Sequence, residues 1–402
     1  MKYVILVGDG MGDLPLAELD NRTPLEAAHT PAMDSLARHG VLYTVATVPN
    51  GMPPGSDVAN LSLLGYLPRK IYSGRAPLEA ASMGIALAED EIAFRCNLVT
   101  LAQDVDQTLK MVDYSAGHIS STEAGELIEA LNRRCATDCI RFYPGVSYRH
   151  LMVHKGELPQ LETVPPHDYS GQDVTQFWER YQRIEHFREL LSEAQKVLAA
   201  HPVNLRRQEQ GKNQANAIWL WGEGKSPVMP PFQERFGKSG ALISAVDLLK
   251  GMAVLAGLEV LPVEGATGYL DTNYRGKVET ALAALKRHDM VFVHVEAPDE
   301  ASHQGLLAEK MQAIEDFDGK VVAPVFEELK TAGEPFRIIV AMDHYTPLSI
   351  KTHDRRPVPV LMYDSTWGKE HPQLRYTEAA AARFGNFLAN GQEMIQLFFS
   401  HD

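Results

Sequence analysis

The chain has 402 residues, of which 45% are hydrophobic and 22% are charged, which is typical of a globular protein long enough for two domains. Its formal net charge of −14 disfavours polyanionic partners, so we expect no binding to nucleic acid or to a membrane surface. No stretch approaches the about 18 apolar residues of a membrane span, and the chain begins directly with an apolar strand. These features predict a cytoplasmic protein.

The three cysteines do not suggest a disulfide framework. Cys135 and Cys139 would be a metal pair only with a second pair of ligands nearby. Because no such pair follows them, we interpret them as reduced thiols.

Residues 1–75 follow the pattern of an α/β domain. An apolar strand at residues 3–7 ends in Gly8-Asp9-Gly10, and Thr-Pro pairs at residues 23–24 and 30–31 open two helices. After a strand at residues 41–48, a rigid loop leads to an amphipathic helix at Ser56. Spacing alone favours Ser56 as the N-cap of that helix. The alternative is a hydroxyl placed among free backbone N–H groups, where a metal would activate it as a nucleophile.

Residues 76–235 predict a compact α+β module, with strands at residues 140–143 and 148–153 and helices at residues 120–131 and 174–200. Most arginines of this segment are expected to be solvated. Arg95 and Arg149 lie within apolar strands, where a fixed guanidinium suits bidentate capture of phosphate or carboxylate.

From residue 236 the α/β order resumes. Helices are predicted at residues 240–255, 277–286, 304–329, 379–384 and 392–399, and strands at 259–263, 289–296 and 336–342. The prolines of residues 357–363 predict an edge strand there. The chain therefore leaves an α/β domain (1–75 and 236–402) for an inserted module (76–235) and returns.

Acidic and imidazole side chains follow three of the predicted strands. Asp9 follows the first, Asp299 and His303 follow the strand at 289–296, and Asp343 and His344 follow the strand at 336–342. His353 stands nine residues after His344. Each alone is explained by a polar loop or a strand-end turn, but in open α/β sheets the carboxyl edge is where sites are built. Oxygen and imidazole donors together suit Zn²⁺ or Mn²⁺.

Two Gly-Lys-Ser triplets, at residues 224–226 and 237–239, suggest a phosphate-binding loop at first sight. The Walker motif requires a glycine five residues earlier, where this chain has Trp219 and Phe232. The sequence therefore argues against an ATP-binding P-loop.

Taken together, the motifs resemble those of the archaeal-type cofactor-independent phosphoglycerate mutases, in the alkaline phosphatase superfamily. The segments that carry this resemblance are residues 7–12, 54–66, 74–81, 95–100, 115–120, 296–300 and 343–347. The resemblance implies an α/β fold, an alkaline-phosphatase-like three-layer sandwich with an inserted smaller α+β lid domain. It also implies two divalent metal ions, with Mn²⁺ as first choice and Zn²⁺, Co²⁺ or Mg²⁺ as alternatives.

The resemblance further implies roles for individual residues. One metal would be bound by Asp9, Ser56, Asp343 and His344, and the other by Asp299, His303 and His353. Ser56 would be the catalytic nucleophile. The residues implied on the substrate side are Arg95, His118, Arg149, His167, Asp168 and Lys250.

The implied reaction is the interconversion of 3-phosphoglycerate and 2-phosphoglycerate through a phosphoserine, with a small phosphorylated hydroxy acid as substrate. Residues 244–248 and 271–274 also resemble a subgroup labelled proposed homoserine kinase. A metal-dependent phosphotransferase acting on homoserine is therefore the alternative, as is a phosphomonoesterase of the same superfamily.

Overall fold

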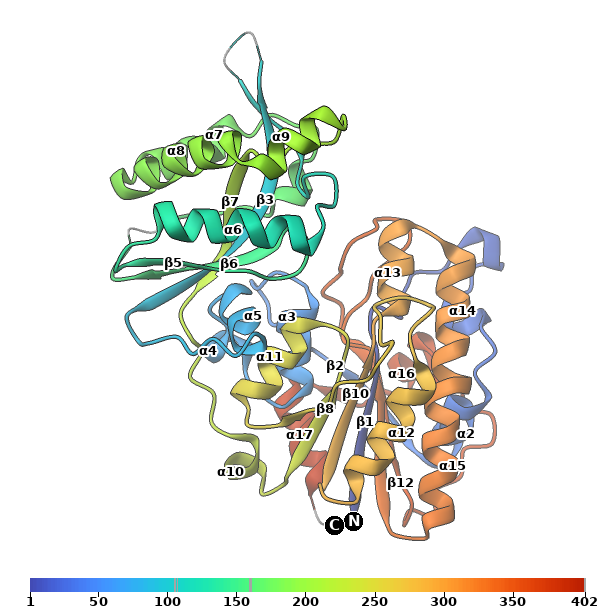
Figure 1. Cartoon of the computed structure of the whole chain (residues 1–402). Helices are drawn as coiled ribbons and strands as arrows, with labels where there is room; N and C mark the ends of the chain where they lie inside the picture. Colours follow the sequence, from blue (N-terminus) through green and yellow to red (C-terminus); the bar gives the residue numbers. More distant parts are fainter. Residues whose placement is uncertain (105, 107, 159–160, 401–402) are drawn as a thin grey trace. The chain divides into compact units, whose positions relative to one another are not determined.

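The computed structural model describes residues 1–104, 106, 108–158 and 161–400, and the chain forms two compact units (Figure 1). Unit 1 combines Met1–Tyr72 with Val228–Asp402, and unit 2 is Ser73–Pro227. The chain therefore leaves unit 1 once, completes unit 2, and returns.

Unit 1 is organised around an eight-stranded sheet with the order β13-β2-β12-β11-β1-β10-β8-β9. The strands are β1 (Lys2–Gly8), β2 (Val41–Val45), β8 (Gly240–Ile243), β9 (Glu259–Val260), β10 (Met290–Val295), β11 (Phe336–Ala341), β12 (Val358–Asp364) and β13 (Phe387–Leu388). β1 runs parallel to both of its neighbours, with Gly8 opposite Val295 of β10 and Val7 opposite Ala341 of β11. Three adjacent strands therefore end together at one edge of the sheet.

Helices cover the sheet of unit 1, and in Figure 1 α12 lies beside the long column that α14 and α15 form end to end. The central strands β1, β10 and β11 are runs of apolar residues that are buried on both faces, as expected for parallel strands between two helical layers. The predicted α/β class is confirmed. The helices are α1 (Pro24–Ala27), α2 (Pro31–His39), α3 (Ser56–Leu63), α4 (Pro68–Ile71), α10 (Phe232–Phe236), α11 (Asp247–Leu255), α12 (Tyr274–Leu285), α13 (Ala297–Gln304), α14 (Leu307–Phe317), α15 (Ala323–Ala332), α16 (Glu378–Phe384) and α17 (Gly391–Phe399).

Two predictions for the sheet are wrong. The predicted helix at residues 240–255 begins with a strand, β8, and turns helical only at Asp247, because residues 240–243 pair with β10 in the buried sheet. The predicted edge strand at 357–363 is an interior strand, since β12 pairs antiparallel with both β11 and β2. Only Pro359 lies inside that strand with a register partner, so the ladder loses a single donor there.

Unit 2 contains a mainly antiparallel sheet in the order β4-β3-β6-β5, with β7 pairing along β3. Its elements are α5 (Ala76–Ser82), β3 (Glu91–Gln103), β4 (Leu109–Asp113), α6 (Ser121–Cys135), β5 (Ile140–Tyr143), β6 (Arg149–Lys155), α7 (Thr175–Gln182), α8 (Glu185–Ala200), α9 (Pro202–Glu209) and β7 (Ala217–Gly224). The helix predicted at residues 174–200 is in fact two helices, which are broken at residues 183–184. None of the helices in the described parts of the chain combines the length and apolar composition needed to cross a bilayer.

His150 is a neutral histidine buried in β6 of unit 2. Its Nδ1 accepts a hydrogen bond from the backbone N–H of Gly145 at 3.0 Å, and its Nε2 has no partner among the described residues. Burial lowers the pKa of His150 to about 4. In the unfolded chain His150 takes up a proton near the ordinary pKa of about 6.5, whereas in the folded chain it does so only near pH 4. The free energy of unfolding therefore falls as the pH drops from about 6.5 toward 4.

We expect His150→Asn to remove part of the acid sensitivity of unit 2, because the Asn oxygen can accept the Gly145 hydrogen bond but does not titrate. Between pH 7.5 and 5.0 the wild-type chain should lose about 2 kcal/mol more unfolding free energy than the variant. Tryptophan fluorescence during urea unfolding is the measurement, since Trp178, Trp219 and Trp221 all lie in unit 2. Equal losses in both proteins would contradict the assignment.

Candidate metal centre

Three buried aspartates meet at the carboxyl edge of the unit 1 sheet. Asp9 follows β1, Asp343 follows β11 after one residue, and Asp299 lies in the first turn of α13, which follows β10. All three side chains are at least nine-tenths buried. Because β11, β1 and β10 are parallel neighbours, the sheet register alone brings these carboxylates together.

The first donor group is formed by Asp9, Asp343 and His294, whose ligand atoms all lie within 4.8 Å of one another. His294 Nε2 is 3.1 Å from Asp9 Oδ2, and the hydroxyl of Ser56 is 3.5 Å from that same oxygen. Asp343 is held in place because its Oδ2 accepts a hydrogen bond from Asn60 at 2.8 Å and its Oδ1 accepts one from the backbone N–H of Gly10.

His294 is the residue that sequence reasoning missed. It lies inside the apolar strand β10, opposite Val7 of β1, and it is fully buried. An imidazole within a strand of otherwise apolar residues was a usable signal, but the strand as a whole predicted only a buried element. Burial lowers the pKa of His294 to about 4, so the ring is neutral at physiological pH.

Ser56 is not the N-cap of its helix. Gly55 occupies that position, and α3 begins at Ser56. Its Oγ lies 3.1 Å from His344 Nε2 and 3.5 Å from Asp9 Oδ2. The capping interpretation is therefore wrong, and the hydroxyl faces the first donor group instead.

The second donor group is formed by Asp299, His344 and His353, again with ligand atoms within 4.8 Å. His303 adjoins it, with Nε2 3.2 Å from Asp299 Oδ2 and 3.0 Å from His353 Nε2. His344 also reaches the first group, since its Nε2 lies 3.4 Å from Asp9 Oδ1 and 3.4 Å from Asp343 Oδ2. All seven residues that the resemblance implied as metal ligands thus lie in one connected cluster, with His344 between its halves.

The electrostatics of this cluster fit a cation-binding site. Burial, and next the neighbouring charges of Asp343 and Asp299, raise the pKa of Asp9 well above its ordinary value. Burial also acts to raise the pKa of Asp299, but hydrogen bonds from His303 and His353 outweigh it and hold that pKa well below its ordinary value. The hydrogen bond with Asp299 raises the pKa of His303 to about 9.

Two buried atoms in the first donor group, Asp9 Oδ1 and His294 Nε2, make no hydrogen bond of suitable geometry to the described residues, although each lies within 3.4 Å of another donor atom of the cluster. His303 donates from Nδ1 to the carbonyl oxygen of Lys351, which directs its Nε2 toward Asp299 and His353. Carboxylate oxygens and imidazole nitrogens that lack protein partners are the donor set that divalent ions such as Mn²⁺ and Zn²⁺ accept.

The backbone and the surroundings of Gly10 explain why a glycine follows Asp9. Its φ is +61°, and a Cβ on it would lie 2.4 Å from Asp299 Oδ1 and 2.7 Å from the hydroxyl of Thr346. Both the left-handed backbone and the close approach of the site side chains therefore require glycine here.

Five of the six residues implied on the substrate side belong to unit 2, where aromatic rings connect them. The His167 ring contacts Trp221 and Tyr114, and the His118 ring contacts Tyr114 and Tyr148. The residues that join this array through their own contacts are Arg95 over Trp221, Arg149 over Tyr148, and Asp168, whose Oδ1 is 3.5 Å from His167 Nε2.

Arg95 and Lys250 have partners within the chain. The Arg95 guanidinium makes a two-point ion pair with Glu79, at 2.8 and 3.0 Å, which holds it rigidly in the array. Lys250 belongs to unit 1, in α11, and pairs with Asp247 at 3.0 Å. The structure therefore gathers five of the six residues and leaves Lys250 in the other unit.

His118 lies on a strained loop. Ala116, Gly117 and His118 are three consecutive residues with positive φ, which is costly for the two that are not glycine. Asp113 holds the loop by accepting hydrogen bonds from the backbone N–H groups of Ser115 and Gly117. Strain that is held in this way is characteristic of functional sites.

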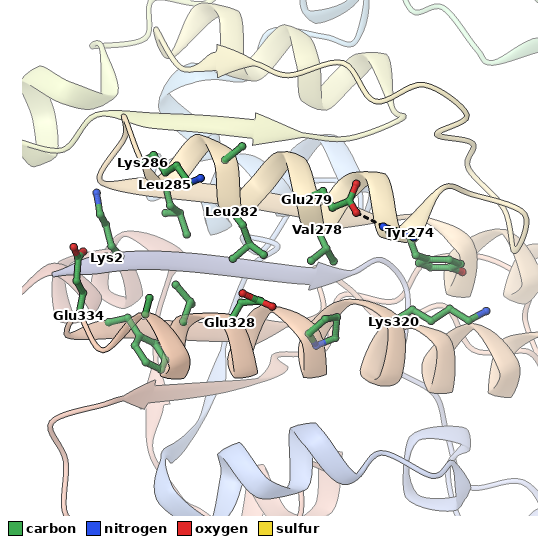
Figure 2. Close-up of a pocket in the computed structure, with 16 residues that line it drawn as sticks. Lys2, Tyr274, Val278, Glu279, Leu282, Leu285, Lys286, Lys320, Glu328 and Glu334 are labelled. Carbon is green, nitrogen blue, oxygen red and sulfur yellow. Dashed lines mark hydrogen bonds and ion pairs between the residues drawn. The ribbon is translucent and has the colours of Figure 1, made fainter.

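A groove of about 1010 Å³ elsewhere in unit 1 does not share this chemistry (Figure 2). It lies between α12 and α15 and includes Lys2 and Phe336 at the amino ends of their strands, whereas the aspartates lie at the carboxyl ends. Val278 and Leu282 point into it, and its charged side chains are lysine, arginine and glutamate. The residues that line it include no histidine and no aspartate.

Comparison with known proteins gives a consistent result. A family model described as 2,3-bisphosphoglycerate-independent phosphoglycerate mutase matches residues 37–204. A protein of that name from Methanosarcina mazei is 56% identical over 364 residues, which cover 90% of each chain. A Geobacter sulfurreducens protein, named as a probable member of the same group, is 51% identical over 397 residues and 99% of each chain.

Two solved structures share the fold over the full chain. A Pyrococcus horikoshii protein matches with a TM-score of 0.82 and 29% identity, covering 100% of this chain and 98% of its own. A cofactor-independent phosphoglycerate mutase from Thermoplasma acidophilum matches with a TM-score of 0.65 and 28% identity, covering 100% of both chains.

Proposed function

The chain belongs to the 2,3-bisphosphoglycerate-independent phosphoglycerate mutases, and from that premise we propose that it interconverts 3-phosphoglycerate and 2-phosphoglycerate through a phosphorylated Ser56. One observation carries this proposal: the Ser56 hydroxyl lies at the start of α3, 3.1 Å from His344 Nε2 and 3.5 Å from Asp9 Oδ2. A hydroxyl among carboxylate and imidazole donors, at a helix N-terminus, suits attack on a phosphoryl group.

We propose two divalent cations for the cluster, with Mn²⁺ as first choice. Asp9, Ser56, Asp343 and His344 would hold one, with His294 beside them, and Asp299, His303 and His353 would hold the other. Two divalent ions and three carboxylates would give the cluster a net charge of about +1. The bound ions would lower the pKa of the serine hydroxyl and neutralise phosphoryl oxygens. The cluster would then attract an anionic substrate although the whole chain is acidic, because surface charge is screened over about 8 Å.

The chemistry balances without a co-substrate. Ser56 Oγ forms a bond to phosphorus while the bond from phosphorus to one glycerate oxygen breaks, and the proton lost by the serine is matched by one gained at the glycerate hydroxyl. The other glycerate hydroxyl then attacks the phosphoserine, and Ser56 regains its proton. His344 Nε2 and Asp9 Oδ2 lie within 3.5 Å of Oγ and would hold the cation that polarises the serine hydroxyl.

We propose that unit 2 acts as the substrate domain. Arg149, His118, His167 and Asp168 are held by its aromatic array and would bind the glycerate carboxylate and hydroxyls, with Arg95 fixing the array from within. A mutase must keep glycerate bound and water out during the reaction, because water attack on the phosphoserine would make the enzyme a phosphatase. We place the reaction in the cytoplasm, in glycolysis.

Three assays on the Mn²⁺-loaded protein test the proposal. Formation of 2-phosphoglycerate from 3-phosphoglycerate, coupled through enolase, is the expected result. Phosphate release from 3-phosphoglycerate without 2-phosphoglycerate would instead indicate a phosphomonoesterase. ATP-dependent phosphorylation of homoserine, with 3-phosphoglycerate unchanged, would indicate the kinase alternative and overturn the proposal.

A further inference from the structure

Thr346 contacts one proposed ligand of each cation, His344 for the first and Asp299 for the second. Its hydroxyl is 2.5 Å from Asp299 Oδ1 and 3.1 Å from His344 Nδ1, and the residue is fully buried. Neither contact is to an atom that faces the other ligands, since the other Asp299 oxygen faces His303 and the other His344 nitrogen faces Ser56. One hydroxyl therefore contacts, from behind, one proposed ligand of each cation.

The single proton of the Thr346 hydroxyl determines which ring nitrogen of His344 carries a proton. A threonine hydroxyl has one proton, and a carboxylate can only accept, so that proton goes to Asp299. The contact with His344 then requires the ring to donate from Nδ1. A neutral His344 with its proton on Nδ1 has a lone pair on Nε2, the atom that lies 3.1 Å from Ser56 Oγ and 3.4 Å from both Asp9 and Asp343.

The position of the Thr346 hydroxyl is itself fixed. The Thr346 backbone N–H donates to Gly12 at 3.1 Å, and its carbonyl oxygen accepts from the buried Lys310 ammonium at 3.0 Å. Lys310 also donates to the carbonyl oxygen of Gly12 and to the carboxylate of Asp13, so it joins the loops that follow β1 and β11. Gly10 leaves room for the hydroxyl, since a Cβ on it would lie 2.7 Å from the Thr346 oxygen.

We propose that Thr346 is a positioning residue that couples the two cation sites, by fixing His344 in the tautomer that binds through Nε2 and by leaving only Oδ2 of Asp299 for the second site. The inference rests on the proposed two-cation centre. Partners of this kind, which orient a ligand from behind, typically change metal affinity by 10- to 100-fold. If the Thr346 hydroxyl couples the two sites, its loss should weaken cation binding at both. If it supports only one ligand, its loss should weaken binding at one site.

The test compares Thr346→Val, which keeps the shape but loses the hydroxyl, with Thr346→Ser, which keeps the hydroxyl. Metal-free proteins labelled with ¹⁵N-histidine report the tautomer of His344 by NMR, with His344→Gln used for assignment. We expect the Nδ1–H form in the wild type and in Thr346→Ser and its loss in Thr346→Val. An Nε2–H form in the wild type would overturn the proposal even if Thr346→Val fails to fold.

Calorimetric titration with Mn²⁺ alone supplies the second readout. Both binding events should weaken roughly 10- to 100-fold in Thr346→Val and stay near the wild type in Thr346→Ser. Equal affinities in all three proteins, or weakening of one site only, would overturn the coupling. A wild-type protein that binds no Mn²⁺ would instead refute the proposed metal centre, while the NMR result would still decide the tautomer.

Discussion

Ser56→Ala should reduce the rate of 2-phosphoglycerate formation by about 10⁴-fold or more, because loss of a covalent nucleophile removes the whole two-step route. Incubation with 3-phosphoglycerate should give no phosphoenzyme that intact-protein mass spectrometry can detect, whereas the wild type should gain the mass of one phosphoryl group. Metal content should fall only modestly, since Asp9, Asp343 and His344 remain. The result therefore separates loss of the nucleophile from loss of the metal centre.

Ser62→Ala is the matched control for this experiment. Ser62 lies in the same helix, is fully buried, and its Oγ accepts a hydrogen bond from the backbone N–H of Gly391 rather than facing the donor groups. The control should lose some stability but keep its turnover and its phosphoenzyme. Substantial turnover in Ser56→Ala, or a phosphoryl group mapped to another residue, would remove Ser56 from the proposed role.

Removal of divalent ions should abolish activity and also destabilise unit 1. Without cations, the three buried carboxylates are destabilised by loss of solvation and by mutual repulsion, as the raised pKa of Asp9 indicates. Saturation of two sites at 100 times their Kd contributes about 5 kcal/mol to the unfolding free energy, by mass action. Thermal unfolding in EDTA should therefore occur at a clearly lower temperature than in Mn²⁺, and added Mn²⁺ should restore both stability and turnover.

Asp299→Asn and His288→Ala provide a pair for the same measurement. Asp299 belongs to the second donor group, whereas His288 lies outside the cluster and pairs with Glu259. We expect the first variant to lose most of the Mn²⁺-dependent stabilisation and the second to retain it. If EDTA leaves turnover and unfolding temperature unchanged in a protein shown by elemental analysis to be metal-free, the metal centre is refuted.

The carboxyl edge of the sheet was predictable because an aspartate follows each of three buried strands within four residues. Parallel pairing of β10, β1 and β11 turns that pattern into proximity, so Asp9, Asp299 and Asp343 meet without any long-range information beyond the strand order. The helix that places His303 four residues after Asp299 was predictable for the same kind of reason, since spacing along α13 puts both on one face.

Other features depend on contacts that a linear pattern does not contain. Serine is a residue type that N-cap positions favour, and its sequence position fits that role. Only the structure, with Gly55 as the N-cap and His344 near the hydroxyl, shows that Ser56 is not the cap. His294 is indistinguishable by spacing from a buried strand residue until β10 is seen beside β1. The apolar composition of residues 240–243 fits a helix or a strand equally well. They form a strand because they pair with β10.

The most direct test of the two-cation centre is a crystal structure of the Mn²⁺-soaked protein with anomalous difference density collected at the manganese edge. If the two-cation centre is right, two peaks are expected in unit 1, one among Asp9, Ser56, Asp343 and His344 and the other among Asp299, His303 and His353. A single peak, or peaks away from the carboxyl edge of the sheet, would contradict it.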